Sequence, residues 1–159
     1  MEEQKDKLER LLKIQKMKAE EKERIRLEDE LLDSFDIRDD VFPLTKKEAD
    51  FIMDEFVQFF PITEWGRIDW GKVDGKVNIK DEDTDLIKDV LISQGFELSQ
   101  EAYLMYGYGD YPFVKTSVQR ILTNLEDLRW IGSDQFIYCP TSKFVIEYFH
   151  DGDITIGWY

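Results

Sequence analysis

The chain has 159 residues, with 35 acidic and 21 basic side chains and a formal charge of −14. This acidity disfavours nucleic acid and anionic membranes as partners, because like charges repel, and it favours a basic partner. The single cysteine, Cys139, excludes a disulfide framework, and no apolar run approaches the roughly 20 residues of a membrane span. With no secretory pattern at the N-terminus, the sequence predicts a cytoplasmic protein.

Residues 2–33 contain neither Gly nor Pro and are dominated by Lys, Glu and Arg, which predicts one long charged helix. Its apolar residues are interrupted between Lys18 and Arg24, whereas a coiled coil needs three or four unbroken heptads. We therefore expect a solvated helix whose C-terminal leucines touch the domain. The predicted organisation is a charged helical extension over residues 1–40 and a single α+β domain over 41–159. Residues 34–159 carry most of the charge, a net −12.

Short sequence motifs predict the elements that follow the long helix. Thr45 and Glu48 have the spacing of a capping box, which predicts a helix that ends before Pro61. The pair Asp74-Gly75, which lies between alternating segments of the stretch 67–79, predicts a hairpin turn. A second helix is expected over 81–93, with acids in its first turn and Gly95 at its C-terminal cap.

The second half of the chain is predicted to be mostly strand. Residues 101–106 alternate as a strand does, and 114–129 have the apolar spacing of an amphipathic helix. Three strands are expected over 135–139, 143–149 and 154–158, with Asp151-Gly152 as a tight turn between the last two. The predicted fold class is α+β: an antiparallel sheet of hairpins packed on one side by helices, with an N-terminal charged helix.

The sequence offers few residues for chemistry. His150 is the only histidine, which excludes a pair of histidines as metal ligands. The acidic run from Asp81 to Asp85 begins like a calcium loop, but Leu86 and Ile92 replace the glycine and the glutamate that such a loop requires. A nucleophile pair of Cys139 with His150, as in a hydrolase, is left open. The sequence predicts no catalytic residue, no cofactor and no metal site.

Tyrosines and acids suggest a binding surface instead. Tyr106, Tyr108 and Tyr111 lie beside the glycines Gly107 and Gly109 at the end of strand 101–106, and tyrosine offers a large contact area with a polar tip. The alternative reading is that these tyrosines pack over the edge of the sheet while the glycines form turns. The predicted partner-binding residues are Asp81, Glu82, Asp83, Asp85, Tyr106, Tyr108, Asp110 and Tyr111.

Three segments carry a resemblance to a known family: FPLT from Phe42 to Thr45, GRIDW from Gly66 to Trp70, and VIEYFHDGDITIGW from Val145 to Trp158. Together, over about residues 42–158, the chain resembles small bacterial immunity proteins of polymorphic or contact-dependent toxin systems. The resemblance implies a cytoplasmic protein that is not an enzyme and that binds a cognate toxin, often a nuclease.

The predicted function is neutralisation of that toxin, expected to be a nuclease domain, by occlusion of its basic active-site or entry surface. The alternative is an SMI1-like adaptor or peptide-binding scaffold with no toxin partner. The identity of the toxin and the oligomeric state are left open by the sequence.

Overall fold

The computed structural model describes residues 1–79, 84–107 and 110–159. The helices of the described part are α1 (Glu2–Asp33), α2 (Lys46–Phe59), the 3-10 helix η1 (Trp70–Lys72), α3 (Thr84–Ser93), α4 (Val118–Thr123) and α5 (Leu125–Leu128). The strands are β1 (Phe42–Pro43), β2 (Gly75–Ile79), β3 (Glu101–Tyr106), β4 (Val114–Ser117), β5 (Gln135–Cys139), β6 (Phe144–Tyr148) and β7 (Ile154–Trp158). They form one antiparallel sheet in the order β1-β4-β3-β5-β6-β7-β2.

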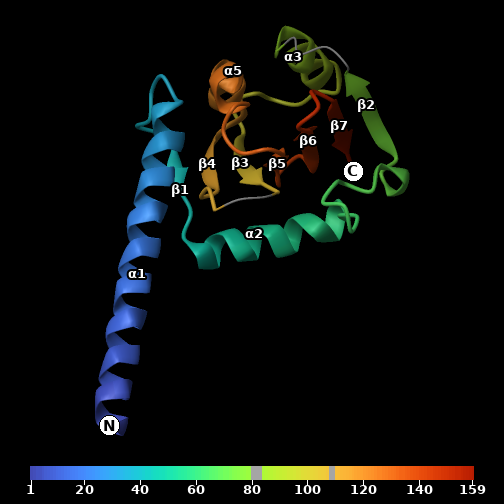
Figure 1. Ribbon diagram of the computed structural model, residues 1–159. Coiled ribbons are helices and arrows are strands. Elements are labelled where there is room, and N and C mark those ends of the chain that lie inside the picture. Colours follow the sequence, from blue (N-terminus) through green and yellow to red (C-terminus); the bar gives the residue numbers. More distant parts are fainter. Residues whose placement is uncertain (80–83, 108–109) are drawn as a thin grey trace.

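Helices cover both faces of this sheet (Figure 1). Successive side chains of a strand point to opposite faces, so Leu104 of β3 faces α3, α4 and α5, whereas Met105 belongs to the cluster under α2. The α+β class and the antiparallel sheet are confirmed. The expectation of one covered face differs from the structure, because α2 packs Phe56 against the rings of Phe136 and Tyr138 on the second face.

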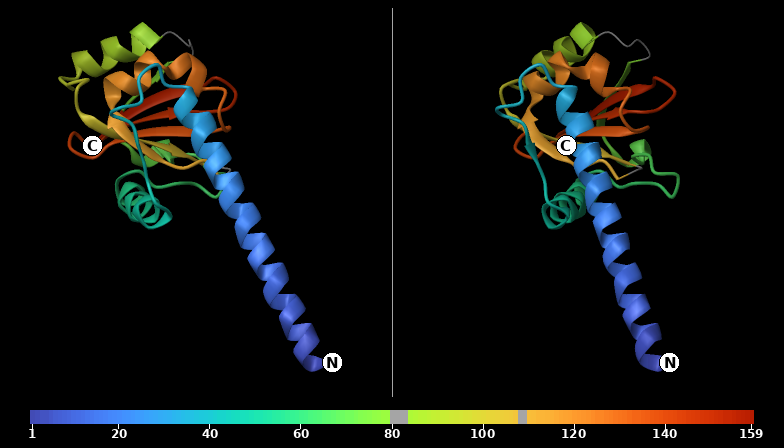
Figure 2. Two further views of the ribbon diagram at one scale, coloured as in Figure 1. Left: turned by 90° about the vertical axis from the view of Figure 1, so that its left-hand side faces the viewer. Right: turned by 60° about the vertical axis from the view of Figure 1, so that its left-hand side comes forward.

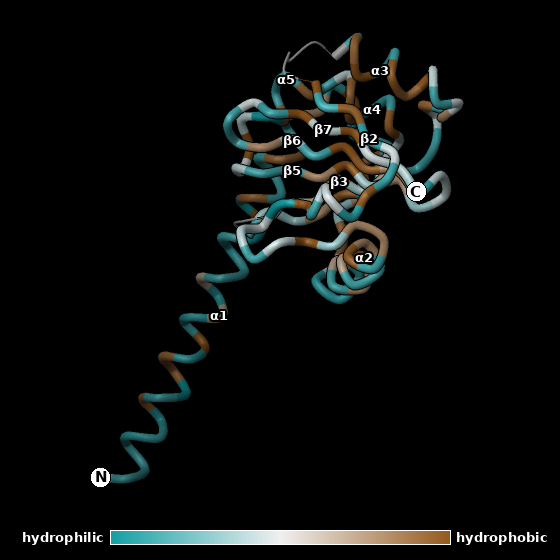
Figure 3. The backbone as a smooth tube through the Cα atoms, turned by 90° about the vertical axis from the view of Figure 1, so that its right-hand side faces the viewer, coloured by the Kyte–Doolittle hydropathy of each residue, from teal (hydrophilic) through white to brown (hydrophobic). Residues whose placement is uncertain are grey.

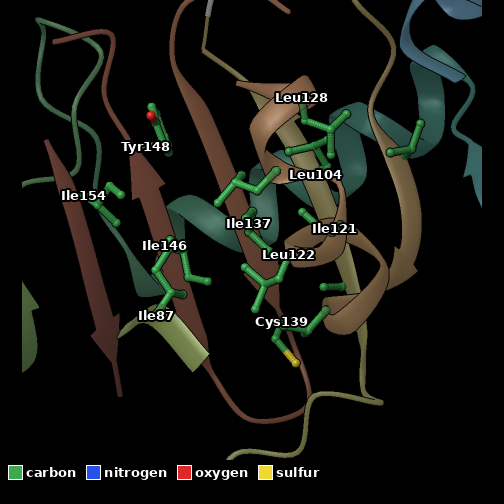
Figure 4. Close-up of a cluster of buried hydrophobic side chains, with 14 of the residues drawn as sticks. Ile87, Leu104, Ile121, Leu122, Leu128, Ile137, Cys139, Ile146, Tyr148 and Ile154 are labelled. Atoms are coloured by element: carbon green, nitrogen blue, oxygen red, sulfur yellow. The ribbon is translucent and has the colours of Figure 1, made fainter. Parts of the chain in front are cut away.

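The larger core lies between the sheet and helices α3 to α5. Its aliphatic side chains come from neighbouring strands and from these helices, as Figure 4 shows for Leu104, Ile137, Ile146 and Leu122. All five residues of β5 and of β6 are buried. Buried on both faces, these central strands form a rigid support for the segments that leave their ends.

The predicted long helix is confirmed as α1, which projects away from the domain in every view (Figures 1 and 2). Residues 1–26 are exposed, while Leu27 and Leu31 near the C-terminal end of α1 are buried. Leu31 and Phe35 belong to the larger core, as expected for the C-terminal leucines of this helix. The division of the chain at residue 40 stays a prediction.

Several local predictions are confirmed. The capping box of α2 forms in both directions, since Glu48 N–H donates to Thr45 Oγ1 and Thr45 N–H donates to Glu48 Oε1. Gly95 has a φ of 82° after α3, and its N–H donates to the carbonyl of Ile92. Gly152, with a φ of 88°, forms the turn between β6 and β7.

The predicted hairpin at Asp74-Gly75 is wrong. Gly75 is the first residue of β2, which pairs with β7 at the far end of the sequence, and Trp70 to Lys72 form η1. A Cβ atom at Gly75 would clash with the indole of Trp158, its partner across the strands. The glycine is therefore required by close contact and not by a turn.

We expect Gly75→Ala and Gly75→Asn to lower the free energy of unfolding by about 1–3 kcal/mol, because either side chain must displace Trp158. Asparagine is favoured in a hairpin turn, so Gly75→Asn would cost less than Gly75→Ala if Gly75 formed a turn. An equal loss of stability in the two variants indicates that close contact with Trp158 requires the glycine. Gly71→Ala is the control, since its new Cβ would come no closer than 3.5 Å to Asp69. Urea unfolding of the three variants checks this, and a stable Gly75→Asn variant would contradict the contact.

The predicted helix over 114–129 is wrong at its start and is interrupted. Residues 114–117 form β4, which pairs with β3 and alternates buried and partly exposed side chains. Ser117 then caps α4, as its hydroxyl accepts the N–H of Arg120. Asn124 separates α4 from α5, and its side chain bonds to Asp36 and to the carbonyl of Arg120. Pairing in the sheet overrides the helical spacing of the apolar residues.

Candidate functional site

Segments distant in sequence meet at one end of the sheet. The strand register places Tyr106 beside Gln135, Gln135 beside Tyr148, Tyr148 beside Ile154, and Ile154 beside Ile79. Four strand spacings separate β3 from β2, a distance of about 19 Å. We call this end of the sheet the loop end. Its described parts are residues 62–70, 84–85, 107, 110–113, 129–134 and 149–153.

Some of the predicted partner-binding residues lie at the loop end. Asp85 is exposed in the first turn of α3, and Asp110 is exposed in the segment after β3. Tyr111 is partly buried, and its hydroxyl donates to Glu30 Oε1 of α1 at 3.2 Å. Asp81, Glu82, Asp83 and Tyr108 lie outside the described residues. The predicted interface stays a prediction.

Tyr106 presents almost no surface, since only 4 % of it is exposed. Its ring centroid lies 5.5 Å from that of Tyr111, and a Cβ atom at Gly132 would clash with the Tyr106 ring. The Tyr106 hydroxyl has no hydrogen-bond partner among the described residues. Burial raises the pKa of Tyr106 above its ordinary value. In this structure Tyr106 is part of the core and not of the exposed surface.

We expect Tyr106→Phe to raise stability at neutral pH by about 1 kcal/mol, because it removes a buried hydroxyl without a partner. The pKa of Tyr106 is higher in the folded state than in the unfolded state. Below about pH 10 the phenol is neutral in both states, and above that pH it ionises first in the unfolded state, so the folded protein loses stability as the pH rises. The variant should therefore lose less stability than the wild type between pH 9 and 11. Urea unfolding across this range checks both effects. If Tyr106→Phe were less stable than the wild type, the Tyr106 hydroxyl would have a hydrogen-bond partner, and the expectation would be wrong.

A groove between residues 129–134 and the 149–153 turn carries an exposed tryptophan. Trp130 is 75 % exposed, and the guanidinium of Arg129 lies 4.8 Å from the centroid of its ring. Trp130, Ser133, His150 and Asp151 line the groove with their neighbours. Sequence reasoning missed Trp130, because a single tryptophan in a predicted helix-to-strand connection has no spacing that indicates exposure.

His150 is held at this groove by a buried carboxylate. Asp134 is 2 % exposed, and its Oδ1 accepts the backbone N–H of His150 at 2.9 Å and lies 3.0 Å from Nδ1 of the same residue. The imidazole itself is 59 % exposed and lies 4.2 Å from the Phe149 ring, centroid to centroid. The structure fixes the His150 ring at the surface.

A second groove lies on the other side of the 149–153 turn. Trp65 is 75 % exposed beside it, and the lining includes Arg67, Trp70, Asn78 and Asp153. Asn78 Nδ2 donates to Asp153 Oδ1 at 2.9 Å and to Thr155 Oγ1 at 3.0 Å. The two exposed tryptophans therefore lie at one end of the sheet, on either side of one turn.

A buried ion pair holds the second groove in place. Glu147 has no exposed side-chain surface, and its Oε1 accepts from Arg67 Nε at 3.0 Å, from Arg67 Nη2 at 2.7 Å and from Trp70 Nε1 at 3.1 Å. Its Oε2 accepts the backbone N–H of Ile68 at 2.8 Å. Burial opposes the charge of Arg67, but its bonds to Glu147 and Asp153 outweigh burial and raise its pKa. These contacts fasten residues 67–70 to β6.

The structure does not bring Cys139 and His150 together. Cys139 is the last residue of β5, at the end of the sheet opposite the loop end, whereas His150 follows β6 at the loop end. Cys139 is fully buried, and burial raises the pKa of its thiol. A cysteine of this kind is a poor nucleophile.

Across residues 1–79, 84–107 and 110–159, no three His, Cys, Asp or Glu side chains gather as a metal site requires. No described helix combines the length and the apolar character needed to cross a membrane.

These features define an α+β protein with aromatic and acidic side chains exposed at one end of an antiparallel sheet. Residues 26–157, which are 132 of the 159 residues, match the family described as CdiI immunity protein, EcoliA0-like. The chain belongs to this family. The predicted resemblance to immunity proteins of contact-dependent toxin systems is therefore confirmed. A comparison with curated proteins gave no match.

Proposed function

We propose that this protein is a cytoplasmic immunity protein that binds a cognate toxin through the loop end and neutralises it. Membership of the CdiI immunity family supports a toxin as the partner. The observation that carries the choice of surface is the presence of two tryptophans, Trp65 and Trp130, each 75 % exposed, at the same end of the sheet. Tryptophan is one of the residues enriched among those that dominate binding energy at protein interfaces.

The charge of the chain supports a basic toxin surface, as a nuclease has for phosphates. The net charge is −14, and Asp85, Asp110 and Asp151 are exposed at the loop end. Opposite fields accelerate association, which suits an inhibitor that must capture a toxin before it acts. The toxin is neutralised because the loop end covers its basic active-site or entry surface.

Binding, and not catalysis, is the proposed activity of this chain. The one catalytic arrangement left open by the sequence paired Cys139 with His150, and these residues lie at opposite ends of β5 and β6. At the loop end, His150 bonds to the buried Asp134 and stands beside Trp130 in the groove lining. Its proposed role is to offer a polar contact next to an aromatic anchor.

Co-expression with the toxin encoded beside this gene tests the proposal. Cells that produce the toxin alone should stop growing, and cells that also produce this protein should grow. The purified pair should elute as one complex, with affinity that falls as salt is raised. Normal growth of cells that make the toxin alone, or rescue without complex formation, would refute the proposal. Stable capture of a housekeeping protein in place of the toxin would favour an adaptor.

A further inference from the structure

The projecting part of α1 exposes apolar side chains to solvent. Figure 3 shows hydrophobic positions along the helix well away from the domain. The exposed residues are Leu8, Leu11, Leu12, Ile14, Met17 and Ile25, each with 48–59 % of its surface exposed. A helix without tertiary contacts is only marginally stable in water. A surface that covers this part of α1 would therefore stabilise it.

One face of α1 follows a heptad pattern through the charged interruption. Alternating steps of four and three residues connect Lys7, Leu11, Ile14, Lys18, Glu21, Ile25, Glu28 and Leu32. Ile25 and the buried Leu27 are about 200° apart around the helix, so this face is exposed as far as Ile25, whereas Leu32 at its C-terminal end packs against the larger core. A shallow groove runs along it between Ile14 and Ile25. We call this face the α1 seam.

The two charged positions at the centre of the α1 seam decide between orientations of a helix pair. In a parallel pair, Lys18 would face Lys18 and Glu21 would face Glu21, and both contacts repel. In an antiparallel pair the same positions place Lys18 opposite Glu21 twice. Charged and polar residues at seam positions set register and orientation in this way. Glu21 also pairs with Arg24 of its own helix, and its side chain is still 57 % exposed.

Charge along the whole helix has the same antiparallel complementarity. Residues 10–18 contain four basic residues and no acid, whereas residues 20–33 contain seven acids and three basic residues. Antiparallel helices therefore bring a basic half against an acidic half at both ends. The charges between Lys18 and Arg24 interrupt the apolar pattern of a single helix. In an antiparallel pair with a second copy of the helix, these charges lie opposite charges of the other sign.

We propose that α1 pairs antiparallel with α1 of a second copy of this chain. Ile14 of each copy packs against Ile25 of the other, and Lys18 lies opposite Glu21. The two domains then lie at opposite ends of the helix pair. The matched family segment begins at residue 26, so most of the α1 seam lies outside it.

Sedimentation of the full chain across micromolar concentrations tests the pairing. We expect a monomer–dimer equilibrium that Ile14→Asp weakens about tenfold or more. Leu12→Asp is the matched control, because Leu12 is 55 % exposed on the same helix but lies about 160° from Ile14 around its axis. A chain that stays monomeric at every concentration, or a dimer weakened equally by both variants, would overturn the proposal.

Charge exchange tests the antiparallel orientation. Lys18→Glu alone places Glu opposite Glu21 and should dissociate the dimer, whereas the double variant Lys18→Glu with Glu21→Lys restores opposite charges and should restore it. Crosslinking gives an independent readout. An equimolar mixture of Ile14→Cys and Ile25→Cys chains should form mixed disulfides, and the native Cys139 is buried. A disulfide between two Ile14→Cys chains would show a parallel pair and overturn the arrangement.

Discussion

Trp130→Ala weakens binding of the cognate toxin by about 30-fold or more in the interface that we propose. A tryptophan anchor typically contributes 2 kcal/mol or more to binding, and each 1.4 kcal/mol is a tenfold change in affinity. Trp130 is 75 % exposed beside His150, so its ring is available to a partner before binding. Calorimetric titration of an inactive form of the toxin domain measures the effect. Trp65→Ala should act in the same direction.

The matched control is Tyr159→Ala. Tyr159 is 71 % exposed, and it follows Trp158 at the end of the sheet opposite the loop end. Its removal should leave affinity unchanged, although it loses contacts with the rings of Phe59 and Phe60. Equal loss of affinity in Trp130→Ala and Tyr159→Ala, at unchanged stability, would show that the loop end is not the binding surface. Growth protection during co-expression should follow the same order.

Arg67→Ala should lower the free energy of unfolding by about 3–5 kcal/mol, the cost typical of breaking a buried ion pair. Its guanidinium makes two hydrogen bonds to Glu147, whose carboxylate has no solvent exposure and is left without its counter-charge. Urea unfolding measures the loss. Arg120→Ala is the control and should cost much less, because its partners Asp36 and Asp40 are about half exposed to water.

A double replacement separates charge from packing at the same site. In Arg67→Met with Glu147→Leu no buried charge remains, so the double variant should be more stable than Arg67→Ala. If both variants were equally unstable, the shape of the two side chains and the bonds to Ile68 and Trp70 would outweigh the ion pair.

Elements specified by neighbouring residues could be predicted from the sequence. The capping box of Thr45 and Glu48, the cap at Gly95 and the turn at Gly152 each depend on a few adjacent residues, and all three are present. Elements decided by distant contacts could not be predicted. Gly75 has the sequence context of a turn, yet its role is set by Trp158. Residues 114–117 have helical spacing and still join the sheet beside β3.

The same distinction applies to the candidate site. The acids and tyrosines near residues 81–85 and 106–111 were predicted from composition, and both segments adjoin strands that end at the loop end. No sequence pattern indicated that Trp65 and Trp130 would lie at one end of the sheet, because strand order is a property of the whole fold. Glu147 and Arg67 stood in two recognised motifs, but only the register of β6 shows that they meet.

The strands that support the loop end have side chains packed on both faces, whereas the segments between them bear the exposed aromatic groups. Mutations of the exposed side chains in these segments therefore change recognition at little cost to folding. Such a scaffold is evolvable: descendants of one ancestor acquire new specificities by replacing surface segments while the interior is retained. Grafting residues 129–133 from one homologue into another, with Asp134 kept to hold His150, is accordingly a direct route to orthogonal pairs.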